Sequence, residues 1–187
     1  QKNNFVFGCE KNGLNKNKAI QLFDEIEKFA GYGFNKSHAA AYAMIAYQTA
    51  YLKANYTLEY LCSLMNCDIG NFEKISSYIN EVKKFNYKLY NPNINESNAH
   101  FKVVYDDYKK AVGIEYGLSA IKNIGENSIL EIIKEREKNG KFSSLLDLLK
   151  RINNSSLNKK ILEALIFSNA LNPLEKNQKF LIEKLED

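Results

Sequence analysis

A break between two helices, followed by an alanine-rich segment, constrains the fold of this chain more than any other feature. Residues 29–53 read FAGYGFNKSHAAAYAMIAYQTAYLK. Gly31 is expected to end the preceding helix as a C-cap, and Ser37 is expected to cap a second helix over residues 37–54. Because apolar groups lie almost all round this second helix, we expect it to be largely buried.

The start of the second helix has the features of an anion site. Free backbone N–H groups and the positive end of the helix dipole favour a phosphate there. Lys36 and His38 add charge and hydrogen-bond donors at the same place. The alternative is a helix start at which these side chains satisfy only local groups.

Most of the remaining chain has the spacing of helices. Apolar residues recur at helical intervals in three further segments, residues 16–30, 57–66 (capped by Thr57) and 72–86. Residues 1–15 contain glycines and several asparagines and are expected to form a loop. Pro92 and a cluster of asparagines predict a connection over residues 88–99.

The pattern changes near the middle of the chain. Weak alternation over residues 100–105 and 111–116 predicts a small β-hairpin, and the pattern is helical again from Leu118 onward. The predicted fold is therefore mainly α and multi-helical with a small β-hairpin. We expect two regions, residues 1–110 and residues 111–187.

Residues 117–133 resemble a helix-hairpin-helix motif, in which a tight turn joins two helices. Gly125 is expected to let the backbone turn sharply and approach a partner without a Cβ atom in the way. Backbone N–H groups there, with Lys122 beside them, would bind DNA phosphates without reading sequence. Asn123 replaces a common glycine, but asparagine tolerates the left-handed conformation. The alternative is a helix pair that only packs.

A second helix pair carries a further polar group. Asn158, Lys159 and Lys160 lie at the start of an expected helix over residues 157–168 and could face a phosphate. On the residues alone, a solvated helix start is the simpler interpretation.

Composition permits a nucleic-acid partner without demanding one, since the net charge is only +4. Cys9, Cys62 and Cys67 are expected to be reduced, buried thiols, and no metal site or complete catalytic constellation is expected in this chain. No apolar run of membrane-spanning length and no signal peptide is found, so we expect no membrane partner. Gln1 in place of an initiator methionine indicates a piece of a longer protein.

The segment Phe29–Lys53 is similar to a signature of the bacterial DNA polymerase III alpha subunits, which are C-family replicative polymerases. The resemblance continues through Asn91–Ser97, Tyr116–Gly125 and Leu157–Asn172. It covers nearly the whole chain, and its unusual residues in order make it specific. Departures from the family pattern occur at Thr57, Ser119 and Asn123.

The resemblance implies a piece of a cytoplasmic DNA-directed DNA polymerase, a nucleotidyltransferase. Residues 1–110 would belong to the late fingers, and residues 111–187 would form the helix-hairpin-helix DNA-binding region. The catalytic aspartates, which hold two magnesium ions, would lie in a palm region upstream of this chain. The chain alone would therefore be inactive.

The resemblance also implies three partners: an incoming deoxynucleoside triphosphate, primer–template DNA and other holoenzyme subunits. The implied nucleotide-binding residues are Asn35, Lys36, Ser37 and His38, with Tyr42 and Tyr47 as packing residues. The expected DNA-binding residues are Lys122, Asn123, Gly125, Asn158, Lys159 and Lys160. The alternative is a stand-alone helical module that binds DNA or other proteins.

Overall fold

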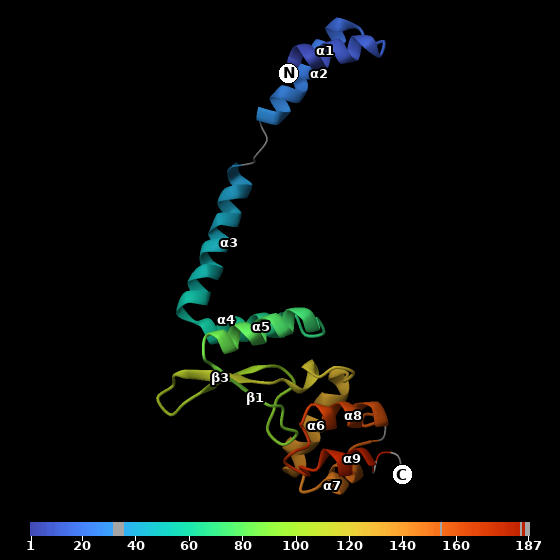
Figure 1. Ribbon diagram of the computed structural model, residues 1–187. Coiled ribbons are helices and arrows are strands. Elements are labelled where there is room, and N and C mark those ends of the chain that lie inside the picture. The colour runs from blue at the N-terminus through green and yellow to red at the C-terminus, as the bar shows by residue number, and fades with distance from the viewer. Residues whose placement is uncertain (32–35, 154, 184, 186–187) are drawn as a thin grey trace. The chain divides into compact units, whose positions relative to one another are not determined.

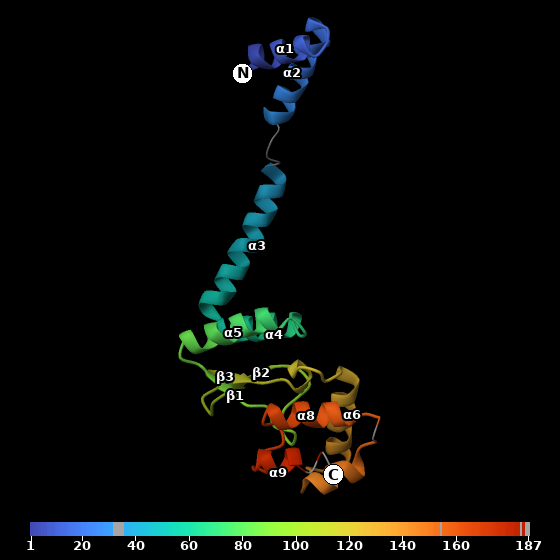
Figure 2. The same cartoon turned by 45° about the vertical axis from the view of Figure 1, so that its right-hand side comes forward.

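The computed structural model describes residues 1–31, 36–153, 155–183 and 185. Its contacts divide the chain into two units, Gln1–Tyr51 and Leu52–Asp187, which are described separately below. Figure 1 labels most of the helices and strands, and Figure 2 also labels β2.

The first unit begins with a pair of helices, α1 (Lys2–Lys11) and α2 (Lys16–Gly31). The prediction of a loop over residues 1–15 is therefore wrong. Phe5 and Phe23 pack with their ring centroids 5.4 Å apart, and Lys2 forms an ion pair with Asp24. Because α1 is stabilised by contacts with α2, the pattern of the first residues alone did not predict it. The α2 helix runs through Gly31, which was expected to follow it as a C-cap.

The alanine-rich segment forms α3 (Lys36–Asn55), as the sequence predicts, but the expected burial is wrong. No residue of α3 is buried, and Tyr47 is 66% exposed. Alanine favours a helix without tertiary contacts, whereas burial depends on whether other residues cover the apolar surface. Ser37 is the second residue of α3, so it does not occupy the predicted cap position.

The second unit begins with α4 (Thr57–Cys67) and α5 (Phe72–Lys84), which lie side by side in Figures 1 and 2. Tyr56, and not the predicted Thr57, occupies the N-cap position of α4. The Thr57 hydroxyl instead donates to the carbonyl oxygen of Lys53 at 2.8 Å. Asn71 caps α5 by accepting a hydrogen bond from the Lys74 amide at 3.2 Å.

A three-stranded sheet follows, formed by β1 (Lys88–Tyr90), β2 (Lys102–Tyr105) and β3 (Ala111–Glu115). The strand order is β1-β3-β2. The predicted hairpin is the antiparallel β2–β3 pair. The parallel strand β1 falls in the segment that was predicted to be a connection. It has only three residues, too few to show an alternating pattern, so its pairing with β3 defines it.

The sheet and the helices α4 and α5 share one hydrophobic core. Its fully buried members include Leu61, Met65, Val82 and Ile114. Of the three cysteines, only Cys62 lies in this core, whereas Cys67 is exposed and Cys9 is half-buried. The prediction of buried thiols therefore holds for Cys62 alone. Burial raises the pKa of the Cys62 thiol to about 11, which keeps it protonated and unreactive at neutral pH.

The last part of the chain is helical: η1 (Leu118–Ala120), α6 (Glu126–Asn139), α7 (Leu145–Arg151), α8 (Lys159–Phe167) and α9 (Gln178–Glu183). Ile129, Leu148 and Leu165 are fully buried in their common core. The Arg136 guanidinium donates to the carbonyl oxygens of Ile94 (2.9 Å) and Ser97 (3.0 Å), which ties α6 to the segment after β1. The predicted fold class, mainly α with a small hairpin, is confirmed.

The predicted boundary between residues 110 and 111 falls at the start of β3, inside the second unit. The division into two units falls inside α3 instead. The assignment of residues 1–110 and 111–187 to separate functional regions stays a prediction.

Candidate nucleic-acid interface

The turn between η1 and α6 depends on one residue with a left-handed backbone. Asn123 has a φ of 69°, the conformation that the sequence predicts asparagine to tolerate here. Ile121 and Ile124 are buried on either side of it, and the Ile124 amide donates to the Ile121 carbonyl oxygen at 3.3 Å. These two side chains anchor the turn and leave the residues between them exposed.

Gly125 lies at the N-cap position of α6, with φ −79° and ψ 144°. Any residue can adopt this extended conformation, so the expectation that Gly125 makes the sharp turn is wrong. The left-handed residue is Asn123, two positions earlier. A Cβ atom added to Gly125 would meet no heavy atom within 4 Å. The absence of a side chain therefore leaves open space directly beside the start of α6.

The N-terminus of α6, like that of α4, has no side-chain cap, whereas three other helices of the second unit have one. Asn71, Ser144 and Asn158 cap α5, α7 and α8 by accepting backbone hydrogen bonds. At α6, the first-turn N–H groups and the helix dipole face the space beside Gly125. Glu126 opens α6, and its carboxylate lies 3.2 Å from His100 Nε2. This histidine gives that carboxylate a partner other than the helix start.

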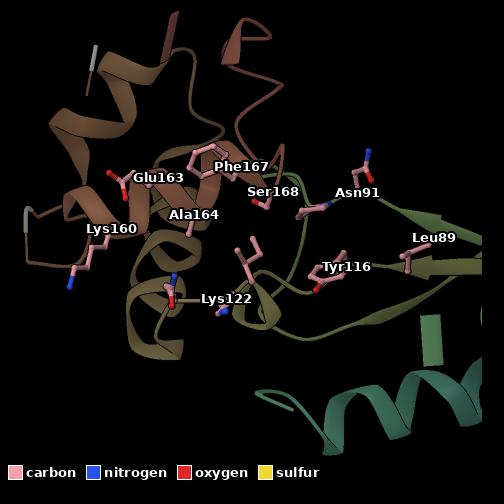
Figure 3. Close-up of a pocket in the computed structure, with 12 residues that line it drawn as sticks. Leu89, Asn91, Tyr116, Lys122, Lys160, Glu163, Ala164, Phe167 and Ser168 are labelled. Atoms are coloured by element: carbon pink, nitrogen blue, oxygen red, sulfur yellow. The ribbon is translucent and has the colours of Figure 1, made fainter. Parts of the chain in front are cut away.

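A cavity of about 780 Å³ lies next to this turn. Three predicted DNA-binding residues line it: Lys122, Asn123 and Lys160. Figure 3 shows the side chains of α8 on one side of the cavity and Tyr116 and Leu89 on the other. The Lys122 ammonium also lies 5.8 Å from the centre of the Phe72 ring. The fold therefore brings together lysines that lie 38 positions apart in the sequence.

Residues 86–181, more than half of the chain, match the family described as "Helix-hairpin-helix motif". The chain belongs to the helix-hairpin-helix family. The match includes the turn at Asn123, the uncapped start of α6 and the second helix pair. The prediction of a helix-hairpin-helix region is confirmed.

The whole length of this helix-hairpin-helix chain is also similar to DNA polymerase III subunit alpha. It is 46% identical over 187 residues to that subunit of Buchnera aphidicola subsp. Schizaphis graminum and 43% identical over 187 residues to that of Escherichia coli K12. It is 44% identical over 182 residues to that of Borreliella burgdorferi. These matches confirm the resemblance found in the sequence. The chain spans only about 16% of the length of these relatives.

Three predicted DNA-binding residues of the helix-hairpin-helix region do not line the cavity. Gly125 lies two positions after Asn123, which does line the cavity, and Asn158 and Lys159 lie at the start of α8. The Asn158 side-chain oxygen accepts the Ile161 amide at 3.1 Å, so it is used as a helix cap. Lys159 is exposed.

Of the four residues predicted to bind a nucleotide, Asn35 lies outside the described residues. Lys36, Ser37 and His38 form the first turn of α3, as predicted. The His38 ring packs against Tyr42, with centroids 4.4 Å apart. Tyr42 and Tyr47, which were expected to be packing residues, make ring contacts within α3, Tyr42 with His38 and Tyr47 with Tyr51, and both are more than half exposed.

Sequence reasoning missed the aromatic part of the cavity. Phe167 lies on α8 and is 65% exposed, and Tyr116 follows β3. Burial raises the pKa of the half-buried Tyr116 phenol. Phe167 lies outside the buried stripe of α8, which is formed by Ile161, Leu162, Leu165 and Ile166. A large aromatic residue outside such a stripe is a sequence feature that could have predicted an exposed binding surface. Tyr116 gave no such signal, because its neighbours in the cavity come from distant segments.

The described residues offer no group of three or more His, Cys, Asp or Glu side chains that could hold a metal ion. Within the same described residues, no helix is long and apolar enough to cross a membrane.

Proposed function

We propose that this chain is the segment of a DNA polymerase III alpha subunit that holds duplex primer–template DNA through its helix-hairpin-helix region. The observation that supports it most is the turn at Asn123, followed by the uncapped start of α6 and the open space at Gly125. Backbone N–H groups at a helix start bind phosphate oxygens and carry no sequence information. Such binding suits an enzyme that must copy every sequence.

Lys122 and Lys160 add charge to this backbone site. Both are exposed, and both line the cavity next to the turn. A lysine that neutralises a DNA phosphate releases a bound counterion, so its contribution weakens as salt rises. The +4 net charge of the chain is modest, which makes the local placement of these lysines matter more than the total.

Replacing Lys122 or Lys160 with glutamine is expected to weaken duplex binding about fivefold each at low salt, whatever the DNA sequence. The slope of log K against log salt is negative, and it should become less steep by about 0.9 for each lysine removed. Fluorescence anisotropy with duplexes of different sequence, at several salt concentrations, measures both quantities.

Lys138→Gln is the matched control, because Lys138 is an exposed lysine in the last turn of the same helix, α6. It removes the same charge far from the turn. If Lys138→Gln lowered affinity and slope as much as Lys122→Gln, binding would depend on total charge alone, and the proposed site would be wrong.

The first turn of α3 is proposed to contact the incoming deoxynucleoside triphosphate, through Asn35, Lys36, Ser37 and His38. Lys36 and His38 are exposed, and Lys36 opens the helix, where the dipole favours an anion. In a full-length subunit that carries this segment, Lys36→Ala is expected to raise the apparent KM for nucleotide about tenfold. Steady-state primer extension measures this KM.

Lys28→Ala provides the control for this prediction, because Lys28 is an exposed lysine of α2 and is not one of the four proposed nucleotide-binding residues. It should leave the nucleotide KM unchanged, and neither variant should shift the melting temperature. An unchanged KM in Lys36→Ala would remove the triphosphate assignment and leave duplex binding untouched.

The polymerase activity of the whole subunit is part of the proposal, and its chemistry is assigned to other residues. Two magnesium ions would activate the primer hydroxyl and stabilise the leaving pyrophosphate. This chain is assigned the binding of DNA and nucleotide. Contacts with other holoenzyme subunits and a place in the cytoplasm follow from the same proposed identity.

A further inference from the structure

The cavity beside the turn has an apolar wall and a cationic rim. The apolar wall is formed by Leu89, Pro92, Tyr116, Ile121 and Phe167. Lys122 and Lys160 are the cationic residues that line it. A nucleotide has the same division, because its base presents a flat apolar face and its phosphate is an anion.

The Phe167 ring is the unusual member of the wall. Its neighbours on α8, Leu165 and Ile166, are buried, whereas Phe167 is 65% exposed. Figure 3 shows its ring at the cavity, on the same helix as Lys160. An aromatic ring left in water next to other apolar residues provides a surface on which a base can stack.

We infer that this cavity takes the base of one unpaired nucleotide, at an end or a gap of DNA, while the phosphate of that nucleotide lies against Lys122 and Lys160. The inference rests on the proposed duplex binding and extends it to a second feature of the DNA. The base stacks on Phe167, and the adjoining duplex is held at the start of α6.

An unpaired base fits the wall better than a base pair does. Within a duplex the faces of each base are covered by its neighbours, and proteins reach only the base edges. A stacking ring needs an open face, which only an unpaired or terminal base offers. The cavity volume of about 780 Å³ falls within the range of about 300–1,000 Å³ that small-molecule sites occupy.

Glu163 also lines the cavity and lies on α8 one helical turn from both Lys160 and Phe167. Its carboxylate offsets part of the attraction of Lys160 for a phosphate, so Lys122, which does not lie on α8, carries more of that attraction. The neutral base is not repelled and occupies the apolar wall.

The test compares two DNA stem-loops that bind to the whole 187-residue chain. One has a blunt end, and the other carries a single unpaired 2-aminopurine at its 5′ or 3′ end. The unpaired end is expected to increase affinity about tenfold over the blunt stem. Stacking should also quench the fluorescence of the unpaired 2-aminopurine, whereas the same probe paired inside the stem should not change.

Phe167→Leu keeps an apolar side chain but removes the ring, and its exposure means that the fold should tolerate it. It should abolish both the preference and the quenching and leave blunt-stem affinity unchanged. Phe180→Leu is the matched control, since Phe180 is an exposed aromatic of α9 that does not line the cavity.

The outcomes distinguish failure of the unpaired-base inference from failure of the proposed duplex binding. Equal affinity for both stems, or a preference that survives Phe167→Leu, overturns the inference and leaves duplex binding standing. Failure of the unaltered chain to bind either stem overturns the proposed function and this inference together.

Discussion

Replacing Gly117 with alanine is expected to lower the free energy of unfolding by about 3 kcal/mol. A Cβ atom at this position would lie 2.5 Å from the carbonyl carbon of His100, 2.7 Å from the carbonyl oxygen of Ala99 and 2.7 Å from the amide nitrogen of Phe101. All three are backbone atoms, so no side-chain rotation can relieve the clash.

Hydrogen bonds hold the two segments together at this point. The Leu118 amide donates to the Asn98 carbonyl oxygen, and the Ser119 amide donates to the Ala99 carbonyl oxygen, each at 2.9 Å. Moving the segments apart to admit a methyl group would break these bonds and open the cores on either side. The φ of Gly117 is −74°, so the loss comes from lack of space and not from backbone strain.

Equilibrium urea unfolding, followed by circular dichroism, measures this change. Gly125→Ala is the control, because it makes the same chemical change at a site with no heavy atom within 4 Å of the added Cβ atom. Its free energy of unfolding should stay within about 0.5 kcal/mol of the unaltered chain. If the two variants had equal stability, residues 98–101 would not pack closely enough on Gly117 to exclude a Cβ atom.

Elements with a strong local pattern were predictable from the sequence. The stripe over residues 72–86 predicted α5, which spans Phe72–Lys84, and alternation predicted the β2–β3 hairpin. In both, the residues that define the pattern also form the contacts. The left-handed Asn123 was predictable for a similar reason, since the side chain itself allows that backbone conformation.

Features that depend on distant residues were not predictable. The strand β1 exists because β3 pairs with it, and α1 because α2 packs on it. The apolar surface of α3 suggested burial, but no residue of α3 is buried. At the candidate site, sequence reasoning found Lys122 and Lys160 separately, and only the fold shows that they line one cavity with Phe167.

Gly125→Ala is expected to reduce duplex affinity on the order of a hundredfold while leaving the melting temperature unchanged. A phosphate oxygen must come within about 2.9 Å of a backbone nitrogen to accept its hydrogen bond. The open space beside Gly125 permits that approach, and a methyl group would occupy it. Loss of two bonds to a charged group, at about 1.5 kcal/mol each, gives this magnitude.

Titration of a labelled duplex with each variant measures the change. Gly8→Ala is the matched control, because a Cβ atom at Gly8 also meets no heavy atom within 4 Å, and Gly8 belongs to α1 and not to the helix-hairpin-helix region. It should change neither stability nor affinity. Unchanged affinity in Gly125→Ala would mean that no phosphate reaches the start of α6.

Salt dependence separates the backbone contact from the lysine contacts. Gly125→Ala removes no charge, so it should lower affinity by the same factor at every salt concentration and leave the slope of log K unchanged. Lys122→Gln should reduce the slope, and its effect should fade as salt rises. If both variants gave this fading pattern, long-range attraction would account for binding, and the amides of the turn would have no part in it.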